Sequence, residues 1–553
     1  MKKISLLVLL SIILIIVVLS GCSSEKSEES SASPSPEAVE TTVPSGESNG
    51  KFDPPIEITT TTTIKPPVKF PAGEDYDNNV WTRAYLDNYG IVVKHKWTVD
   101  EGQYDTKTNL MIASGDLADF FAVNGEQFKQ LAEAGQIEDL TAAYANAPES
   151  AKMILTEGGD KPLKAATIDG KLMAIPFTVN PKESTPVLWI RMDWLKQVNL
   201  PEPKNMDDVL KIAKAFKTQD PDKNGKADTY GFLADNTLYS LKGFMNSHHA
   251  YNGIWEKDAS GNLVYSSLQP AMKTVLQKLQ DLYKAGMIDP EFAVKNFEKA
   301  SESLVSGQVG MFYGDSSGSA GGIDVQTVRN QNNKADFKAF PLLSVDSEPA
   351  RPQMNSAVPQ YWVVKKGYAH PDAVFKILSF WVDTFYLNAS DDIQEKFISS
   401  ADGNQPWYLS SVMAYRALRN VGIQVAVNQL FSGELKPEDA TPAQRSIFDS
   451  VKKFEAGDDT KYSLNAAFGK EGGRGIIMDY DKANLFMENE FFTSATPTMA
   501  EKMSTLEKIQ DQAIIKIITG APIADFDKFV DDWNASGGAA ITKEVNDWYA
   551  TVK

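Results

Sequence analysis

Side chains that could hold a metal ion are concentrated in residues 219–231, which read QDPDKNGKADTYG. Acidic or amide side chains occupy alternate positions, and Gly225 stands at the sixth position counted from Asp220. A calcium loop of the EF-hand type needs this spacing, because alternate oxygen ligands converge on one ion and the glycine allows a sharp bend. The pattern predicts calcium bound by four side chains and one backbone carbonyl: Asp220, Asp222, Asn224, the carbonyl of Lys226, and Asp228.

Position twelve of the same loop is Gly231, where an EF-hand has a bidentate glutamate. We therefore do not expect a switch-type EF-hand, and we expect a weaker site or one that borrows a ligand, such as Thr229. A surface turn after a helix is the alternative, since Asp, Asn, Gly and Pro also dominate ordinary turns.

A second chemical motif is GDSSG, residues 314–318, which satisfies the nucleophile pattern G-x-S-x-G with Ser316 at its centre. A serine hydrolase would also need a downstream histidine, and His370 is the only one. His370 precedes Pro371 at a predicted helix start, where a structural role is natural. We therefore predict that the protein is not an enzyme. A polysaccharide-processing hydrolase with two carboxylates is the alternative, because 73 acidic residues could include such a pair.

The N-terminus predicts a lipoprotein signal peptide over residues 1–21. Lys2 and Lys3 precede an apolar run, and the sequence Leu-Ser-Gly then leads into Cys22, the only cysteine. Small residues before a cysteine are typical of lipoprotein processing, so we expect a lipid on Cys22 and a location on the extracellular face of the cell membrane. Residues 22–50 are rich in Ser, Glu, Pro and Thr, and they predict a disordered tether.

Composition restricts the function of the rest of the chain. About 500 residues with 42% hydrophobic content are enough for two substantial lobes. The formal charge of −18, with acidic residues spread along the chain, argues against nucleic acid and anionic lipid as partners. We expect a monomer.

The pattern of elements indicates an α/β protein. Strand-like runs at residues 56–63, 91–99, 119–123 and 171–179 alternate with helical runs, which predicts a lobe with a largely parallel sheet. Residues 206–216 predict a helix with Asn205 as its N-cap, and the metal-type loop follows that helix directly. Further strands are predicted at residues 309–315 and 361–367. From residue 406 onward the chain is predicted to be mostly helical, with a capping-type helix start in residues 496–517.

Five segments together resemble the extracellular solute-binding lipoproteins of bacterial ABC importers, in the carbohydrate-binding branch and of the LplA and YtcQ type found in Gram-positive bacteria. The segments are residues 113–121 (ASGDLADFF), 188–232, 307–315 (GQVGMFYGD), 360–378 and 495–538. They occur in order across nearly the whole mature chain.

The resemblance implies a two-lobed, type II periplasmic-binding-protein fold with a ligand cleft and extra C-terminal helices. Lobe 1 would contain residues 51–187 with part of 360–553, and lobe 2 residues 188–359 with the other C-terminal helices. The chain would cross near residues 187–193 and return near 359–363. The expected ligand is an oligosaccharide that is passed to ABC permease subunits. Similar proteins bind alginate or other uronates and carry a comparable loop, so calcium would have a structural role.

Sugar recognition needs flat apolar faces and polar side chains that pair with hydroxyl groups. Aromatic residues near the implied crossings are therefore candidates, although such a residue taken alone is more often core than ligand site, and Trp194 and Trp381 are predicted to be core. Arg191 and Asp315 are candidate hydrogen-bonding groups, with a salt bridge as the alternative for Arg191. If the ligand is acidic, Arg191, Arg83 and Arg351 are the arginines to test. The aromatic candidates are Trp189, Trp255, Tyr313, Tyr361, Trp362 and Trp407.

Overall fold

The computed structural model describes residues 46–48, 50–355, 358–400 and 402–553, and residues 47–553 form one compact unit. The predicted signal peptide, the lipidation site Cys22 and most of the predicted tether lie outside the described residues. None of the described helices combines the length and the apolar character needed to cross a membrane.

Buried hydrophobic residues form two large clusters, and we define each lobe as one cluster with its surrounding elements. The first-lobe cluster draws on residues 52–175 and 361–414. The second-lobe cluster draws on residues 187–354 and 421–545. The chain therefore passes between the lobes three times, and the predicted two-lobed α/β fold is confirmed.

The first lobe contains a parallel pair of strands, β3 (Ile56–Thr63) and β4 (Ile91–Val99), and a sheet in the order β5-β17-β8. In that sheet β17 (Gln360–Val364) runs antiparallel to both β5 (Phe120–Val123) and β8 (Ile175–Phe177). The predicted strands are present, but the expectation of a largely parallel sheet is wrong, because a strand from the returning chain separates β5 from β8. Helices of this lobe include α1 (Val80–Tyr89), α2 (Tyr104–Ser114), α3 (Gly125–Glu133), α5 (Glu149–Thr156), α6 (Lys161–Ala165) and α13 (Asp372–Val382).

The second lobe is built on a sheet in the order β10-β13-β9-β16. Every residue of β9 (Val187–Arg191) and β13 (Val309–Gly314) is buried, as expected for central strands. The first passage between lobes therefore lies in residues 178–186, ahead of the range 187–193 that was predicted. The other strands and main helices are β10 (Tyr230–Phe232), β16 (Phe337–Phe340), α7 (Met192–Gln197), α8 (Met206–Thr218), α9 (Lys242–Ser247), α10 (Pro270–Lys284), α11 (Phe297–Val305) and α12 (Val325–Gln331).

Helix α8 forms as its sequence predicts. The Asn205 side chain accepts a hydrogen bond from the Asp208 N–H at 3.0 Å and caps the helix. Val209, Ala213 and Phe216 are buried on one face against the sheet. The loop of residues 219–229 then connects α8 to β10.

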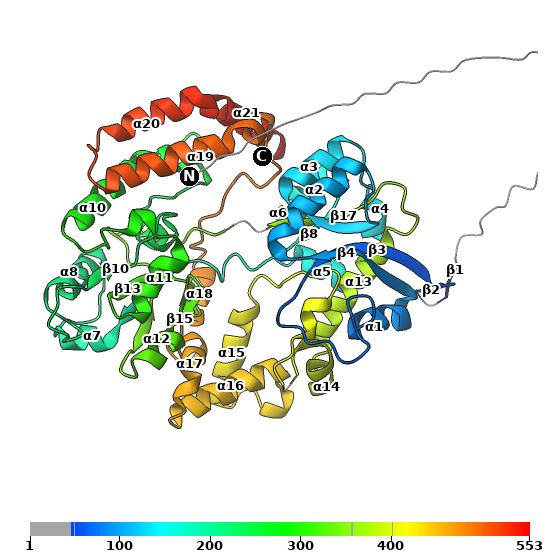
Figure 1. The fold of residues 1–553 in the computed structure, drawn as a ribbon, viewed down its shortest axis with the longest axis horizontal. Coiled ribbons are helices and arrows are strands. Elements are labelled where there is room, and N and C mark those ends of the chain that lie inside the picture. Colours follow the sequence, from blue (N-terminus) through cyan, green and yellow to red (C-terminus); the bar gives the residue numbers. More distant parts are fainter. Residues whose placement is uncertain (1–45, 49, 356–357, 401) are drawn as a thin grey trace, which may run out of the picture. The chain divides into compact units, whose positions relative to one another are not determined.

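Helices from the C-terminal third complete the second lobe. Figure 1 shows α19 (Pro497–Ile518) and α20 (Asp525–Trp533) beside α10, and Gln280 of α10 donates to the carbonyl of Ala521 at 2.7 Å. Thr496 caps α19, as its sequence predicts, by accepting from the Met499 N–H. The remaining helices are α15 (Arg419–Ser432), α16 (Pro442–Glu455), α17 (Tyr462–Phe468), α18 (Gly473–Lys482) and α21 (Ala539–Val552).

Candidate ligand-binding cavity and hinge

The first and third connections between the lobes are hydrogen-bonded to each other. The Tyr415 N–H donates to the carbonyl of Thr178 at 2.9 Å, and the Thr178 hydroxyl donates to the carbonyl of Tyr415 at 3.2 Å. The carboxylate of Glu183 accepts from the N–H groups of Asn420 and Val421 at 2.6 and 2.9 Å. These two segments therefore form a joined hinge at the start of α15.

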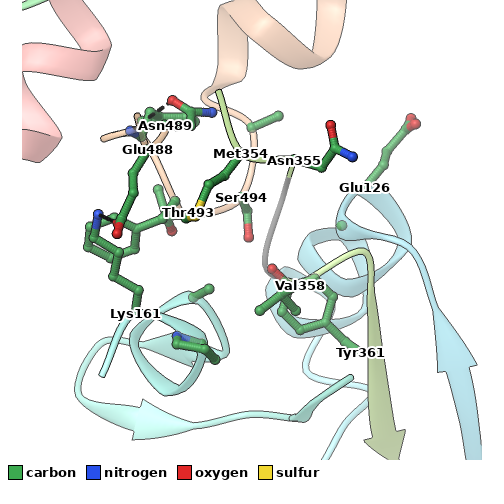
Figure 2. A pocket seen from close by; sticks show the side chains of 16 residues that line it. Glu126, Lys161, Met354, Asn355, Val358, Tyr361, Glu488, Asn489, Thr493 and Ser494 are labelled. Carbon is green, nitrogen blue, oxygen red and sulfur yellow. Dashed lines mark hydrogen bonds and ion pairs between the residues drawn. The ribbon is translucent and has the colours of Figure 1, made fainter. Parts of the chain in front are cut away.

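A cavity of about 320 Å³ is lined by both lobes (Figure 2). Its walls combine aromatic rings, amides, hydroxyls and both signs of charge, which is the chemistry of a sugar site. The first lobe contributes α3, α6 and β17, and the second contributes residues 354–355 and 488–495. The polar and aromatic lining residues are Glu126, Lys161, Asn355, Tyr361, Glu488, Asn489, Phe491, Phe492, Thr493 and Ser494.

Charged contacts connect the two walls of this cavity. Lys161 of the first lobe pairs with Glu488, and its ammonium lies 5.6 Å from the centre of the Phe492 ring. Lys129 donates to the carbonyl of Ala495 at 2.5 Å. The side chains of Lys161 and Glu488 are 31% and 38% exposed, so water competes for this ion pair and its contribution to stability is small. Such contacts can break when the lobes move.

Tyr361, a candidate for sugar stacking, forms part of the cavity wall. Its ring stacks on Phe128 with centroids 4.5 Å apart, and burial raises its pKa to about 12. The opposite wall is shaped by Asn489, whose side-chain oxygen accepts from the N–H groups of Trp255 and Phe491 at 3.0 and 3.1 Å. Trp255 is 3% exposed and supports this wall from behind.

A lysine adjoins the cavity through Asn355. The ammonium of Lys242 donates to the side-chain oxygen of Asn355 at 2.9 Å and lies 4.9 Å from the centre of the Tyr239 ring. Burial lowers the pKa of Lys242 to about 8, because the charged form loses hydration.

Trp189 and Tyr313 were candidates for sugar stacking, and the structure places them in the core of the second lobe. Trp189 is fully buried, and its indole N–H donates to the carbonyl of Asp315 at 2.9 Å. Tyr313 is 2% exposed and stacks on Phe232. Both side chains stand on the central strands β9 and β13, which are covered on both faces. Asp315 uses its carboxylate to accept from the Ser317 N–H at 2.7 Å, which stabilises the turn after β13.

The three arginines named for an acidic ligand have other partners. Arg191 forms a salt bridge with both oxygens of Asp193 at 2.8 and 2.5 Å, but its side chain is buried within the second lobe, so the pair is neither the surface nor the interlobe salt bridge expected as the alternative. Arg83 pairs with Glu74 at 2.6 Å. Arg351 donates to the carbonyl of Phe486 at 2.7 Å.

Two further aromatic candidates border other cavities. Trp362 lines a cavity of about 290 Å³ in the first lobe, and its buried indole N–H has no hydrogen-bond partner among the described residues. Trp407 lines a cavity of about 450 Å³ beside the hinge. The structure thus brings Tyr361, Trp362 and Trp407 to cavity walls, but not to the same cavity.

The serine motif does not assemble a catalytic triad in the described residues. Ser316 is fully buried, donates to the carbonyl of Glu183 at 3.2 Å and accepts from Arg474 at 2.8 Å. His370 belongs to the other lobe, where its ring packs against Phe52. The serine therefore connects β13 to the hinge.

Glu183 and Arg474 were missed by reasoning from sequence. The guanidinium of Arg474 lies 3.8 Å from the Glu183 carboxylate, and burial lowers the pKa of Arg474. Glu183 lies in a polar stretch, NPKES, that reads as an ordinary turn. No sequence pattern connects residues so far apart, so only the fold identifies this pair.

The loop after α8 has its polar side chains turned toward one another. Asp220 accepts from the N–H groups of Asn224 and Gly225 at 3.1 and 3.0 Å. The Asn224 amide donates to Asp222 and Asp228 at 2.7 and 3.1 Å. Partial burial, together with the neighbouring Asp220, raises the pKa of Asp222. These donors suit a hard cation such as calcium, which prefers carboxylate, amide and carbonyl oxygens.

Across the described part of the chain, no group of three or more His, Cys, Asp or Glu side chains is arranged to hold a metal ion. The possible extra ligand Thr229 donates its hydroxyl to the carbonyl of Phe216 at 2.7 Å. Packing explains the missing glutamate, because a Cβ at Gly231 would lie 2.7 Å from the Cβ of Ala213.

Known sequences similar to this chain include a polysaccharide-binding protein and a lipoprotein. It is 22% identical over 493 residues to the polygalacturonan/rhamnogalacturonan-binding protein YtcQ of Bacillus subtilis, covering 83% of this chain and 85% of that protein. It is 27% identical over 237 residues to lipoprotein LipO of the same organism, covering 41% of this chain and 45% of that protein.

Solved structures share the fold. An HMO-binding solute-binding protein associated with an ABC transporter, from Bifidobacterium longum infantis, gives a TM-score of 0.63 at 17% identity, covering 90% of this chain and 98% of that one. An EF-hand mutant of the Streptococcus pneumoniae ABC-transporter substrate-binding protein FusA, in complex with fructo-nystose, gives 0.57 at 16% identity and covers 90% of this chain and 100% of that one.

A family model described as bacterial extracellular solute-binding protein matches residues 73–384, which is more than half of the chain. The protein therefore belongs to the bacterial extracellular solute-binding protein family.

Proposed function

We propose that this protein captures an oligosaccharide outside the cell and delivers it to the permease of an ABC importer. The observation that carries the proposal is the cavity lined by both lobes, with aromatic and amide side chains on its walls. A ligand in such a place contacts both lobes at once and so favours a closed form. The sugar-binding relatives support the same class of ligand.

Capture without chemistry is part of this proposal. Ser316, the residue that a serine hydrolase would use, is buried in contacts with Glu183 and Arg474. Closure needs only a hinge, and the joined segments around Thr178 and Tyr415 provide one. The protein thus releases the same sugar that it binds.

Anchoring through a lipid on Cys22 accompanies capture in this proposal. The sequence before Cys22 has the lipoprotein pattern, and the similarity to lipoprotein LipO supports it. A tethered protein stays close to the membrane and so reaches a membrane permease at a high effective concentration. Mass spectrometry of Cys22 in the full-length protein would test the lipid, and an unmodified thiol there would contradict it.

The test of function is a melting experiment with residues 47–553, the compact unit, against neutral and acidic oligosaccharides. A ligand that binds the native state raises the melting temperature by mass action. We expect a rise with one class of sugar, and recovery of that sugar intact. Cleaved sugar would indicate a hydrolase, whereas no rise with any oligosaccharide would contradict capture.

We also propose a structural calcium ion in the loop of residues 219–229. The donors would be Asp220, Asp222, Asn224, the carbonyl of Lys226, and Asp228, and an ion there would offset repulsion among three carboxylates. FusA, whose solved mutant is described as an EF-hand mutant, supports the idea.

The test of calcium replaces Asp220 and Asp222 with alanine. We expect calcium to raise the melting temperature of the unsubstituted protein and not that of the variant. The matched control is Asp258→Ala, because Asp258 also accepts backbone N–H bonds in a turn, from Ser260 and Asn262. If the substitutions lower stability equally in calcium and in chelator, the loop does not bind a stabilising calcium ion.

A further inference from the structure

Two cavities beside the hinge meet at Arg419. One, of about 450 Å³, is lined by Trp407 and Tyr415, and the other, of about 520 Å³, extends toward α15, α16 and α17. Both are lined by Gln394, Ser399 and Arg419. Each lies in the size range of about 300 to 1,000 Å³ that small-molecule sites occupy.

Arg419 differs from every other arginine in the described part of the chain, because its guanidinium has neither an ion pair nor a hydrogen bond there. It lies only over an aromatic ring, 4.9 Å from the centre of Phe385. The nearby Arg416 pairs with Glu157 at 2.6 Å, and Arg445 pairs with Asp391 at 2.6 Å. The buried Arg474 also has polar partners, in Ser316 and Glu183.

The surroundings of Arg419 favour a negative charge. It is the first residue of α15, where the helix dipole is positive, and its charge helps to lower the pKa of Arg474. The Glu183 carboxylate is already held by Asn420 and Val421. Glu395 also lines the larger cavity. An arginine without a carboxylate partner in a cavity is suited to a bidentate contact with an anionic ligand.

The other side chains around Arg419 suit a sugar ring. Trp407 and Tyr415 are half-buried aromatic residues on the cavity wall, and Trp407 is fixed by donating its indole N–H to Gln405 at 3.2 Å. Gln394 and Ser399, which are joined by a hydrogen bond of 2.9 Å, offer polar groups for hydroxyls. Flat rings, amides and one arginine match a sugar that carries a carboxylate.

We propose that Arg419 binds the carboxylate of an acidic sugar residue, with Trp407 and Tyr415 against the ring. This inference rests on the proposed function, adds a contact site beside the hinge that shares no lining residue with the cavity lined by both lobes, and specifies the substrate class as acidic oligosaccharides. It also makes Arg419 the residue that discriminates acidic from neutral sugars.

The experiment compares a galacturonate trimer, its methyl ester and the neutral sugar kestose by calorimetry with residues 47–553. Esterification removes the charge and keeps the sugar backbone. We expect the unsubstituted protein to bind the acid at least about tenfold more tightly than the ester, as for one charge-assisted contact. Arg419→Gln is expected to abolish that difference, and Arg419→Lys to keep part of it.

The matched control is Arg445→Gln, which removes a paired arginine and is expected to keep the full preference for the acid. Equal binding of acid and ester by the unsubstituted protein would overturn the inference. So would an unchanged preference in Arg419→Gln. Binding of kestose alone would refute the acidic subsite but leave sugar capture intact. If none of these three sugars binds, and no sugar of the wider panel binds either, both the acidic subsite and sugar capture are refuted.

Discussion

At the residue scale, two tryptophans of one predicted class have opposite environments. Trp189 stands on a central strand and donates its indole N–H to a backbone carbonyl inside the core. Trp407 lies after the last strand of the first lobe, beside a cavity and next to the hinge. Both residues are tryptophans, so residue type could not predict which one lies in the core and which one lines a cavity. That difference depends on how deeply the segment carrying each residue is buried in the fold.

The first prediction concerns Gly231. Replacing it with glutamate would complete the calcium loop by sequence, but its Cβ would lie 2.7 Å from the Cβ of Ala213. We expect Gly231→Glu to lower the free energy of unfolding by about 1–3 kcal/mol or more, as overpacking does. Urea denaturation measures this loss. The control is Gly102→Ala, since a Cβ there has no neighbour within 4 Å. A Gly231→Glu variant that is stabilised in calcium would contradict the packing argument.

The second prediction concerns the charge on Lys242. Its pKa is lowered from 10.5 to about 8, so between those values the unfolded chain binds more protons than the folded one. Stability from this group is therefore fully present above the unfolded pKa and is lost as pH falls through about 8.

The measurement is the melting temperature of Lys242→Met at pH 7.5 and 9.5. We expect the variant to gain stability relative to the unsubstituted protein at the lower pH and to lose part of that advantage at the higher one, because pH 9.5 lies between the two pKa values. Lys273→Met, which removes an exposed lysine paired with Asp527, is the control. If the melting temperatures of the Lys242→Met variant and the unsubstituted protein differ by the same amount at both pH values, Lys242 carries no buried charge.

At the element scale, α15 begins with a cap supplied by another segment. Leu418 at the cap position has no side-chain hydrogen bond, and the Glu183 carboxylate binds the N–H groups of Asn420 and Val421 instead. A carboxylate there satisfies N–H groups that the helix leaves open and interacts favourably with the helix dipole. The hinge and the helix are thus held by one side chain.

The third prediction is that Glu183→Gln destabilises the protein. Glutamine has one oxygen in place of two and no charge, so we expect the free energy of unfolding to fall by about 1.5–3 kcal/mol, the range for a hydrogen bond to a charged group. Chemical denaturation would measure this. Glu157→Gln is the control, because its pair with Arg416 is partly exposed and contributes about 0–1 kcal/mol. Equal effects of the two substitutions would assign Glu183 no special role.

At the scale of the whole molecule, three connections and weak ion pairs join the lobes. Lys161 and Glu488 are partly hydrated, so their pair opposes opening only slightly. The hydrogen bonds between Thr178 and Tyr415 keep the first and third connections together. Motion is therefore expected at the hinge, with each hydrophobic cluster moving as a body.

The fourth prediction is that a bound oligosaccharide changes the distance between the lobes. Residues 47–553 contain no cysteine, so Asp87→Cys in the first lobe and Asn333→Cys in the second can be labelled specifically. We expect transfer efficiency between two fluorophores at these sites to rise when sugar is added, because closure shortens the distance. Two labels within one lobe, at Asp87→Cys and Asp169→Cys, should show no change. Unchanged efficiency in the first pair at saturating sugar would exclude closure.

The sequence by itself determined the local features of this protein. Helix α8 and its Asn205 cap, the strands β3, β4 and β13, the capped start of α19 and the polar loop at residues 219–229 follow from periodicity, capping and turn chemistry, which act over a few residues. The core positions of Trp194 and Trp381 were also predicted and are observed.

Only the tertiary structure decided which side chains reach a cavity and which are enclosed. The pairing of β17 between β5 and β8 and the contact of Glu183 with α15 join residues far apart in the chain. Within the described residues, the fold also leaves the guanidinium of Arg419 without an ion pair. Burial and ion pairing depend on neighbours that are distant in the sequence, so the spacing of residues along the chain does not predict which side chains are buried or paired. Trp189 and Arg191 were therefore chosen as ligand-site candidates only because they lie near an expected crossing between lobes. Arg419 could be identified as a candidate only from the fold, which places it between two cavities.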